Sequence, residues 1–197
     1  MKKPKVFNPL DKVVLGETVV EALLAAPSIP LESVEKFRGA GIYALYYSGS
    51  FKPYKPLADS DTPTPIYVGK AVPKGKRKGI DLEASRKTEA LFKRLIEHAK
   101  SIEAAQNLSL SDFSCQIILV DEIWIGLGES LVIQRFKPLW NTVVEGFGNH
   151  DPGNGRYKGK CPLWDEFHSG RAWAKKCQPP KLNAGQIKDL VQDYFEA

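Results

Sequence analysis

Two short segments of strand-forming residues each place a tyrosine beside a glycine: Gly41-Ile42-Tyr43 and Tyr67-Val68-Gly69. A guanidinium, an imidazole, a carboxylate and an amide follow along the chain, supplied by Arg94, His98, Glu129 and Asn141. Hydrolysis of a phosphodiester needs a water that has lost a proton, positive charge at the phosphate and help for the leaving oxygen. Together these side chains could meet all three needs around one metal ion.

Each of the four later residues has a role that suits its type. Arg94 can hold phosphate oxygens in a bidentate fork. Glu129 is a hard oxygen ligand suited to Mg²⁺, with Mn²⁺ as the expected substitute. His98 is four residues after Arg94, so both should project from one face of a helix. There His98 could accept a proton or orient a phenol, and Asn141 could orient the segment that carries Glu129.

A tyrosine that acts as a general base needs an explanation, because its unperturbed pKa is about 10. Near neutral pH about one phenol in a thousand is ionised, which corresponds to roughly 4 kcal/mol. Lys70, Arg94 and the metal ion could lower the pKa of a nearby phenol. Alternatively, a neutral phenol could pass its proton to His98. The sequence is compatible with both routes.

Every one of these residues also has a purely structural interpretation. Tyrosines in strands usually serve packing, and Arg94 with His98 could form an ordinary exposed helix face. Glu129 could be a favourable charge in the first turn of its helix, and Asn141 could cap a turn. The functional hypothesis therefore depends on the combination and its order.

The positive charge of the chain is concentrated in one segment. The net charge is +5, and the segment from Lys70 to Lys100 contains ten basic and four acidic residues. Such a local excess suits a polyanion, because each neutralised phosphate releases counterions; the alternative is a solvated, lysine-rich surface. The basic residues predicted to bind DNA are Lys70, Lys74, Lys76, Arg77, Lys78, Arg86 and Arg156.

The composition is typical of a globular protein, with 43% hydrophobic and 26% charged residues. No stretch approaches the roughly 18 apolar residues of a membrane span, and no apolar signal core follows the basic first residues. The three cysteines lack CxxC spacing, which favours reduced thiols in a cytoplasmic protein. The alternative is a zinc site formed by Cys161, His168 and Cys177.

Periodicity predicts the elements that must position the candidate residues. Residues 1–38 should contain a helix ending near Pro27, and 48–65 and 146–160 should be loops. Strands are predicted over 41–47, 65–70 and 113–120. Helices are predicted over 85–105, with Leu91, Leu95, Ala99 and Ile102 inward, and over 128–137, ending before Pro138. A last helix should begin after Asn183, with Ile187, Leu190, Val191 and Tyr194 inward.

The motifs resemble those of the GIY-YIG nuclease family. Gly41-Ile42-Tyr43, Tyr67-Val68-Gly69, Arg94-x-x-x-His98, Glu129 and Asn141 appear in the family's order over about residues 39–142. The chain is most similar to the type II restriction endonuclease branch, including enzymes that cleave CCGCGG. Valine in place of isoleucine in the second motif is a conservative change, and the long insert between the two tyrosines is shared with that branch.

The resemblance implies an α/β (α+β) fold whose three-stranded antiparallel sheet is flanked by helices. It implies Mg²⁺-dependent cleavage of double-stranded DNA that leaves 5′-phosphate and 3′-hydroxyl ends. Tyr43 would then be the base, Tyr67 and Arg94 would bind water and phosphate, His98 would support proton transfer and Glu129 would hold the metal. A single domain, 1–197, would comprise a core (39–142), an N-terminal extension (1–38), an insert (48–64) and a C-terminal extension (143–197).

A GC-rich site would be read by arginines contacting guanine, with Arg77, Arg86 and Arg156 as candidates and the lysines on phosphates. Cutting both strands of a palindrome requires two copies of the site, hence a C2 homodimer. Its interface is expected in the N-terminal region and the 48–64 insert. The alternatives are a repair or homing nuclease of the same family and a non-catalytic DNA-binding protein on this fold.

Overall fold

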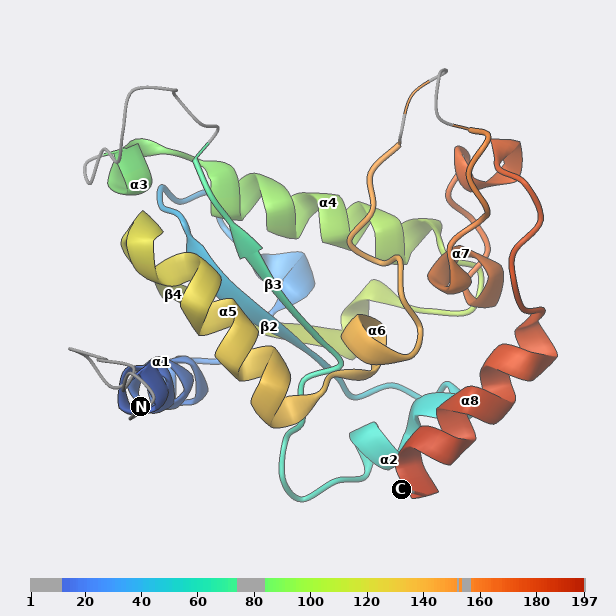
Figure 1. Ribbon diagram of the computed structural model, residues 1–197, viewed down its shortest axis with the longest axis horizontal. Coiled ribbons are helices and arrows are strands. Elements are labelled where there is room, and N and C mark those ends of the chain that lie inside the picture. Colours follow the sequence, from blue (N-terminus) through green and yellow to red (C-terminus); the bar gives the residue numbers. More distant parts are fainter. Residues whose placement is uncertain (1–11, 74–83, 152, 154–156, 197) are drawn as a thin grey trace, which may run out of the picture.

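A four-stranded antiparallel sheet with helices on both faces organises the protein (Figure 1). The computed structural model describes residues 12–73, 84–151, 153 and 157–196. The strands are β1 (Ile29–Pro30), β2 (Gly41–Tyr47), β3 (Tyr67–Ala71) and β4 (Phe113–Leu119), in the order β1-β4-β2-β3. The α-helices are α1 (Lys12–Ala25), α2 (Lys55–Ala58), α3 (Ala84–Lys87), α4 (Ala90–Ala104), α5 (Glu122–Phe136), α6 (Leu139–Thr142), α7 (Leu163–Phe167) and α8 (Ala184–Glu196). Short 3-10 helices are η1 (Leu31–Ser33), η2 (Lys52–Tyr54), η3 (Leu110–Asp112) and η4 (Ala174–Lys176).

The mixed α/β fold is confirmed, but the sheet has one strand more than predicted. β2 is the central strand, pairing with β3 on one side and with β4 on the other. The additional strand is β1, whose residues Ile29 and Pro30 pair with Cys115 and Ser114 of β4. A strand of two residues is too short to produce an alternating pattern, so the sequence gives no signal for it.

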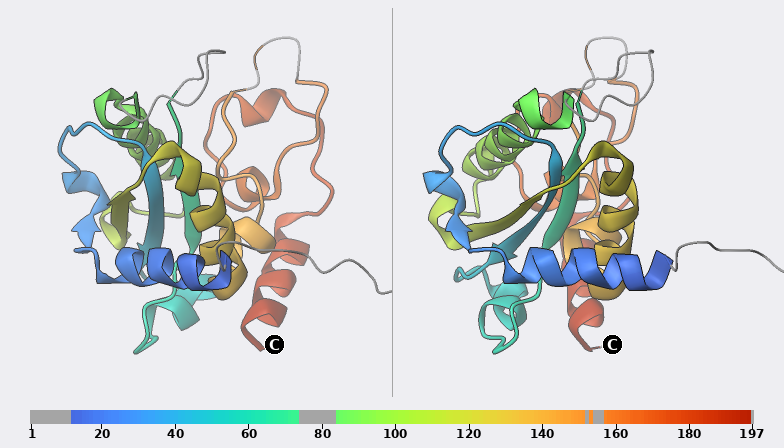
Figure 2. Two further views of the ribbon diagram at one scale, coloured as in Figure 1. Left: turned by 60° about the vertical axis from the view of Figure 1, so that its left-hand side comes forward. Right: turned by 90° about the vertical axis from the view of Figure 1, so that its left-hand side faces the viewer.

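The two faces of β2 are buried against different parts of the chain. Tyr43, Leu45 and Tyr47 share a core with the inward residues of α4 and with the C-terminal helices. Ile42 and Ala44 face the other way, toward buried residues of α1 and α5. Figure 2 shows α1 lying across one end of α5. In the part of the chain that the structure describes, both faces are covered, so a large substrate can approach the sheet at its edges, of which β3 carries the second motif.

The helix predicted over 85–105 is interrupted. The stripe of Leu91, Leu95, Ala99 and Ile102 is buried as predicted, but α3 and α4 are separate helices. The Thr88 hydroxyl accepts a hydrogen bond from the Ala90 amide at 3.1 Å, which satisfies one of the free amides at the start of α4. Local side-chain bonding of this kind competes with a continuous helix.

Three other predictions of local structure were wrong. The helix expected over 128–137 begins at Glu122, so Glu129 lies in its middle rather than in its first turn. The segment 48–65 contains η2 and α2 because proline is favourable in a helix's first turn, where Pro53 and Pro56 stand. Leu190 is exposed, although Ile187 and Val191 of α8 are buried as predicted.

The last helix, α8, begins with the cap predicted at Asn183. The Asn183 side-chain oxygen accepts a hydrogen bond from the Gln186 backbone amide at 2.9 Å, and the Gln186 side-chain oxygen accepts one from the Asn183 backbone amide at 3.1 Å, which confirms the predicted cap. In the part of the chain that the structure describes, no helix is both long and apolar enough to cross a membrane.

Candidate active site

Tyr43 and Tyr67 meet over a glycine. Tyr43 is fully buried on β2, and its cross-strand partner on β3 is Gly69. A Cβ at Gly69 would lie only 2.6 Å from Cζ of Tyr43 and 2.9 Å from Cε1 of Tyr67. Gly69 therefore provides the space in which the two rings approach, with centroids 6.2 Å apart. The glycine of the second motif therefore has a steric role, because any side chain at this position would occupy the space that the two rings need.

Tyr43 forms a hydrogen bond with His98 of α4. The distance from the Tyr43 hydroxyl to His98 Nε2 is 2.5 Å, and both residues are buried. Burial raises the pKa of Tyr43 well above its ordinary value, although the charge of Arg94 opposes the rise. Burial, assisted by the charges of Arg94, His150 and Arg171, lowers the pKa of His98 well below its ordinary value. Both groups are neutral near pH 7, so the phenol donates and Nε2 accepts.

Arg94 lies one turn before His98 and faces the same space. Its Nη2 donates to the carbonyl oxygen of Gly148 at 2.6 Å, and its Nη1 donates to the Glu97 carboxylate at 3.2 Å. The Nη1 group also contacts the imidazole of His150. The side chain of Arg94 is 17% exposed. Its guanidinium is thus oriented by the protein while part of it stays accessible to a phosphate.

Glu129 approaches from the opposite face of the sheet. It lies on α5 and reaches the edge strand β3, where Lys70 Nζ is 2.7 Å from its Oε2 atom. The side chains of Glu129 and Lys70 are 18% and 42% exposed. Burial raises the pKa of Tyr67, with the charge of Glu129 adding to the rise and that of Arg94 opposing it. The charge of Glu129 therefore acts on the Tyr67 phenol, and Figure 1 shows α5, the helix of Glu129, running beside β3.

The comparison with protein families agrees with this geometry. A family model described as the Eco29kI GIY-YIG domain matches residues 35–195. The chain belongs to this family. It is a GIY-YIG family of type II restriction endonucleases, and Eco29kI itself cleaves CCGCGG. The resemblance that the motifs indicated is confirmed, and the match extends through most of the C-terminal extension. Among curated proteins, none matches the chain.

In this GIY-YIG chain Asn141 holds the strand of the second motif. Its side-chain oxygen accepts from the Val68 amide at 2.8 Å, and its side-chain nitrogen donates to the Val68 carbonyl at 2.9 Å. Because Val68 lies between Tyr67 and Gly69, this pair of bonds fixes both residues of the motif. Asn141 thus orients β3, and not the segment carrying Glu129 as the sequence suggested.

Sequence reasoning missed the loop of residues 146–150 as part of the site. The Phe147 ring is stacked on His98, with centroids 4.4 Å apart and planes at 17°, and it meets Tyr67 edge-on. Gly148 supplies the carbonyl for Arg94, and a Cβ there would lie 2.6 Å from the Tyr67 hydroxyl. An aromatic residue between two glycines shortly after Asn141 was the available signal. The composition of 146–160 by itself predicts only a loop.

Only part of the predicted DNA-binding set can be placed. Lys74, Lys76, Arg77, Lys78 and Arg156 lie outside the described residues. Lys70 is at the edge of the site, as described above. Arg86 lines a cavity of about 400 Å³ together with Arg38 and Trp124, near the end of the sheet where β2 begins. Arg38 was not singled out from the sequence.

The zinc site considered for Cys161, His168 and Cys177 was wrong. One ring nitrogen of His168 lies 2.5 Å from the Tyr54 hydroxyl, and the other lies 2.8 Å from Asn107 Oδ1. Neither nitrogen is free to bind a metal. Among the described residues, no group of three or more His, Cys, Asp or Glu could hold an ion.

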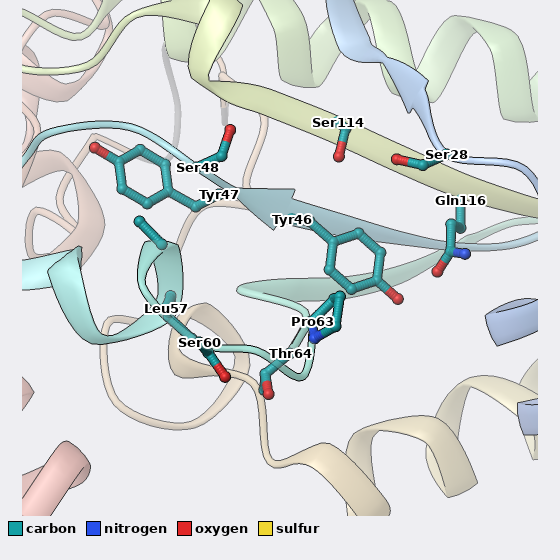
Figure 3. A pocket seen from close by; sticks show the side chains of 11 residues that line it. Ser28, Tyr46, Tyr47, Ser48, Leu57, Ser60, Pro63, Thr64, Ser114 and Gln116 are labelled. Atoms are coloured by element: carbon teal, nitrogen blue, oxygen red, sulfur yellow. The ribbon is translucent and has the colours of Figure 1, made fainter.

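The cavity in Figure 3 is separate from this site. It has a volume of about 270 Å³ at the end of β2. Tyr46, which faces it, points away from the Tyr43 side of the strand. Its described lining consists of small hydroxyl, amide, aromatic and apolar side chains, none of them charged. Such a lining does not suit a phosphodiester, whereas the Arg94 site does.

Proposed function

We propose that this protein is a site-specific type II restriction endonuclease that hydrolyses DNA with Mg²⁺, leaving 5′-phosphate and 3′-hydroxyl ends. The observation that carries the proposal is the buried Tyr43–His98 hydrogen bond beside Arg94. Burial raises the pKa of the phenol and lowers that of the imidazole, which favours the neutral form of both. A phenol bonded to an unprotonated imidazole, next to a fixed guanidinium, can move a proton while a phosphate is held. A protein that only binds DNA needs no such arrangement.

The residues fit a single Mg²⁺ ion. Glu129 is a half-buried carboxylate at the edge of the site, with Lys70 as its present partner. Mg²⁺ keeps most of its waters and is usually held by one or two carboxylates plus substrate phosphate, so one acid is sufficient. Glu129 would hold the ion, and Mn²⁺ would substitute for it. When bound, the ion would polarise the phosphate and stabilise charge on the leaving oxygen.

The protein's own groups favour a proton relay. A raised pKa makes the tyrosinate form of Tyr43 rarer than the one in a thousand of a free phenol near neutral pH. We therefore assign the second route: the Tyr43 oxygen takes a proton from the attacking water while its own proton passes to His98 Nε2. The lowered pKa of His98 keeps the imidazole unprotonated before this step and makes it hold the proton only transiently. The hydroxide adds to phosphorus as the P–O3′ bond breaks, and Arg94 holds the phosphate oxygens. The departing O3′ takes a proton from solvent to become the 3′-hydroxyl, and His98 then gives up the relayed proton to solvent.

Recognition and assembly follow from the same proposal. A palindromic, GC-rich site similar to CCGCGG would be read by arginines in the major groove, with Arg86 and the neighbouring Arg38 as candidates. Lys70 would contact phosphate. Two copies of the chain would form a C2 homodimer that cuts both strands. Each copy, 1–197, would act as one domain in the cytoplasm, with 39–142 as its catalytic core.

Plasmid cleavage tests the proposal directly. Purified protein with Mg²⁺ should cut plasmid DNA into discrete fragments, and run-off sequencing of the ends should give one palindromic site. Glu129→Gln should abolish cleavage while leaving DNA affinity within about tenfold, because the amide is a poorer Mg²⁺ ligand of the same shape. Fragments without preferred ends would indicate a nonspecific nuclease. Binding without cleavage in any divalent metal would indicate a non-catalytic DNA-binding protein.

A further inference from the structure

A buried ion pair in the C-terminal part of the chain is connected to the candidate site through a loop that both contact. Asp165 accepts two hydrogen bonds from Arg171, from Nε at 2.6 Å and from Nη2 at 2.5 Å, and both residues are buried. The rings of Trp164 and Trp173 lie 4.6 and 4.9 Å from the guanidinium carbon. A buried guanidinium is costly unless its donors are satisfied, so its remaining partners are informative.

Those partners are the backbone of the loop at residues 146–149. Nη1 of Arg171 donates to the carbonyls of Phe147 at 3.1 Å and Asn149 at 3.0 Å, and Nη2 donates to that of Gly146 at 3.0 Å. Three of four successive carbonyls thus bind one side chain. The carbonyl of Gly148 instead accepts from Nη2 of Arg94 at 2.6 Å. One loop therefore lies between two guanidinium groups.

The same loop forms one wall of the site. The ring of Phe147 stacks on His98, which places the imidazole that receives the Tyr43 hydrogen bond. His150, at the end of the loop, contacts Arg94. A change in the path of this loop would move the acceptor of Arg94 and the ring against His98 together.

We propose that Arg171 is a positioning residue for DNA cleavage, acting through the 146–149 carbonyls to orient Arg94. The inference rests on the proposed function of the Arg94 site. Holding three carbonyls fixes the direction of the fourth, so Arg94 is presented to the phosphate in one orientation. Misplacing a catalytic group by about 1 Å can cost about 100-fold in rate.

Arg171→Lys is the first variant, because lysine keeps the charge but cannot reproduce a planar fork that serves three carbonyls and a carboxylate. Single-turnover cleavage of a duplex carrying the site mapped on plasmid DNA should slow by about 10- to 100-fold. The Kd for the same duplex without divalent metal should stay within about threefold, since many phosphate contacts contribute to binding. Trp173→Leu loosens the same guanidinium more gently, and should slow cleavage about threefold even if Arg171→Lys folds poorly.

Asn107→Ala is the matched control. Asn107 also secures the C-terminal part, through His168 and the Phe167 carbonyl, but none of its described contacts reaches the 146–149 loop. This variant should lower the melting temperature yet leave the single-turnover rate within about twofold. Equal slowing in Asn107→Ala and Arg171→Lys would show that general destabilisation explains the loss, and would overturn the proposal.

A double variant separates the two levels of inference. If Arg171 acts through Arg94, Arg171→Lys should slow cleavage much less in an Arg94→Lys background than in the wild type. The same factor in both backgrounds would overturn the positioning role alone. Unchanged cleavage in Arg94→Lys and Arg94→Ala would instead contradict the proposed function of the site.

Discussion

Two tyrosine–histidine pairs in this protein have the same hydrogen bond but different surroundings. Tyr43 with His98 and Tyr54 with His168 each have a hydroxyl-to-Nε2 distance of 2.5 Å, and all four residues are buried. Burial raises the pKa of both phenols and lowers that of both imidazoles, to about 3 for His168. As isolated pairs they are chemically equivalent.

The difference lies in the neighbouring groups. The Tyr54 hydroxyl also accepts from the Trp140 indole at 2.9 Å, and His168 is held by Asn107. Burial is the resolved cause of the lowered pKa of His168, whereas charges of Arg94, His150 and Arg171 add to the effect of burial on His98. A neutral phenol–imidazole pair is thus a packing unit among neutral partners. Beside a fixed cation at the edge of the sheet, it can serve as a proton relay.

The largest expected effect separates the two pairs directly. Tyr43→Phe removes the hydroxyl proposed to relay the proton, so single-turnover cleavage should fall by about 1,000-fold or more. Tyr54→Phe should keep the cleavage rate but lower the free energy of unfolding by about 1–3 kcal/mol, because the Trp140 N–H and His168 Nε2 lose a buried partner. Cleavage assays and urea denaturation of both variants give the comparison. Similar loss of cleavage in the two variants would remove the distinction between the pairs.

The first pair could be predicted from the sequence and the second could not. The reason is that both contacts join residues far apart in the chain, and only the first pair belongs to a motif. The alternation over 41–47 and the apolar stripe of α4 correctly place Tyr43 and His98 on their elements. That they meet was implied by the family motif and not by spacing, since 55 residues separate them. Tyr54 and His168 are 114 residues apart and belong to no motif, so neither was assigned to the other.

The same limit explains the missed loop. Arg171 binds carbonyls 22 to 25 residues earlier in the chain, and backbone carbonyls carry no sequence signal. Local features were easier: the cap at Asn183 uses contacts three residues apart. At Thr88 a continuous helical pattern misled the prediction, because the helix is interrupted where the Thr88 hydroxyl accepts a hydrogen bond from the Ala90 amide.

A second prediction concerns the space that the first pair occupies. Gly69→Ala would place a Cβ against the Tyr43 ring, displacing the phenol from His98, and should slow cleavage by about 100-fold. Gly126→Ala on α5 is the matched control, because a Cβ there meets nothing within 4 Å. It should leave cleavage unchanged and raise the free energy of unfolding by about 0.5–1 kcal/mol. Normal cleavage in Gly69→Ala would show that the position of the Tyr43 ring is not critical.

The pH dependence of stability tests the neutral pair. The folded pKa of His168 lies below its ordinary value, so between about pH 6.5 and 3 the unfolded chain binds the proton and the native protein does not. Stability should therefore fall as pH drops through this window, by about 1.4 kcal/mol per pH unit for this residue. His168→Gln cannot be protonated and should show a correspondingly shallower acid decline in urea denaturation. An identical slope in both proteins would contradict the neutral buried state of His168.

The smallest effect concerns Lys70 and Glu129, the charged residues at the sheet edge near the Tyr43 pair. The Lys70–Glu129 bridge is partly exposed, so Lys70→Met should change the free energy of unfolding by no more than about 0.5 kcal/mol. If Lys70 also contacts a phosphate, the slope of log Kd against log salt, measured without divalent metal, should decrease by about one. Lys55→Met is the control, since Lys55 of α2 pairs with Asp59, the residue that follows this helix. If the slope is the same in both variants, Lys70 neutralises Glu129 but does not contact a phosphate. The positive charge that distinguishes the Tyr43 pair from the Tyr54 pair would then come from Arg94 and not from Lys70.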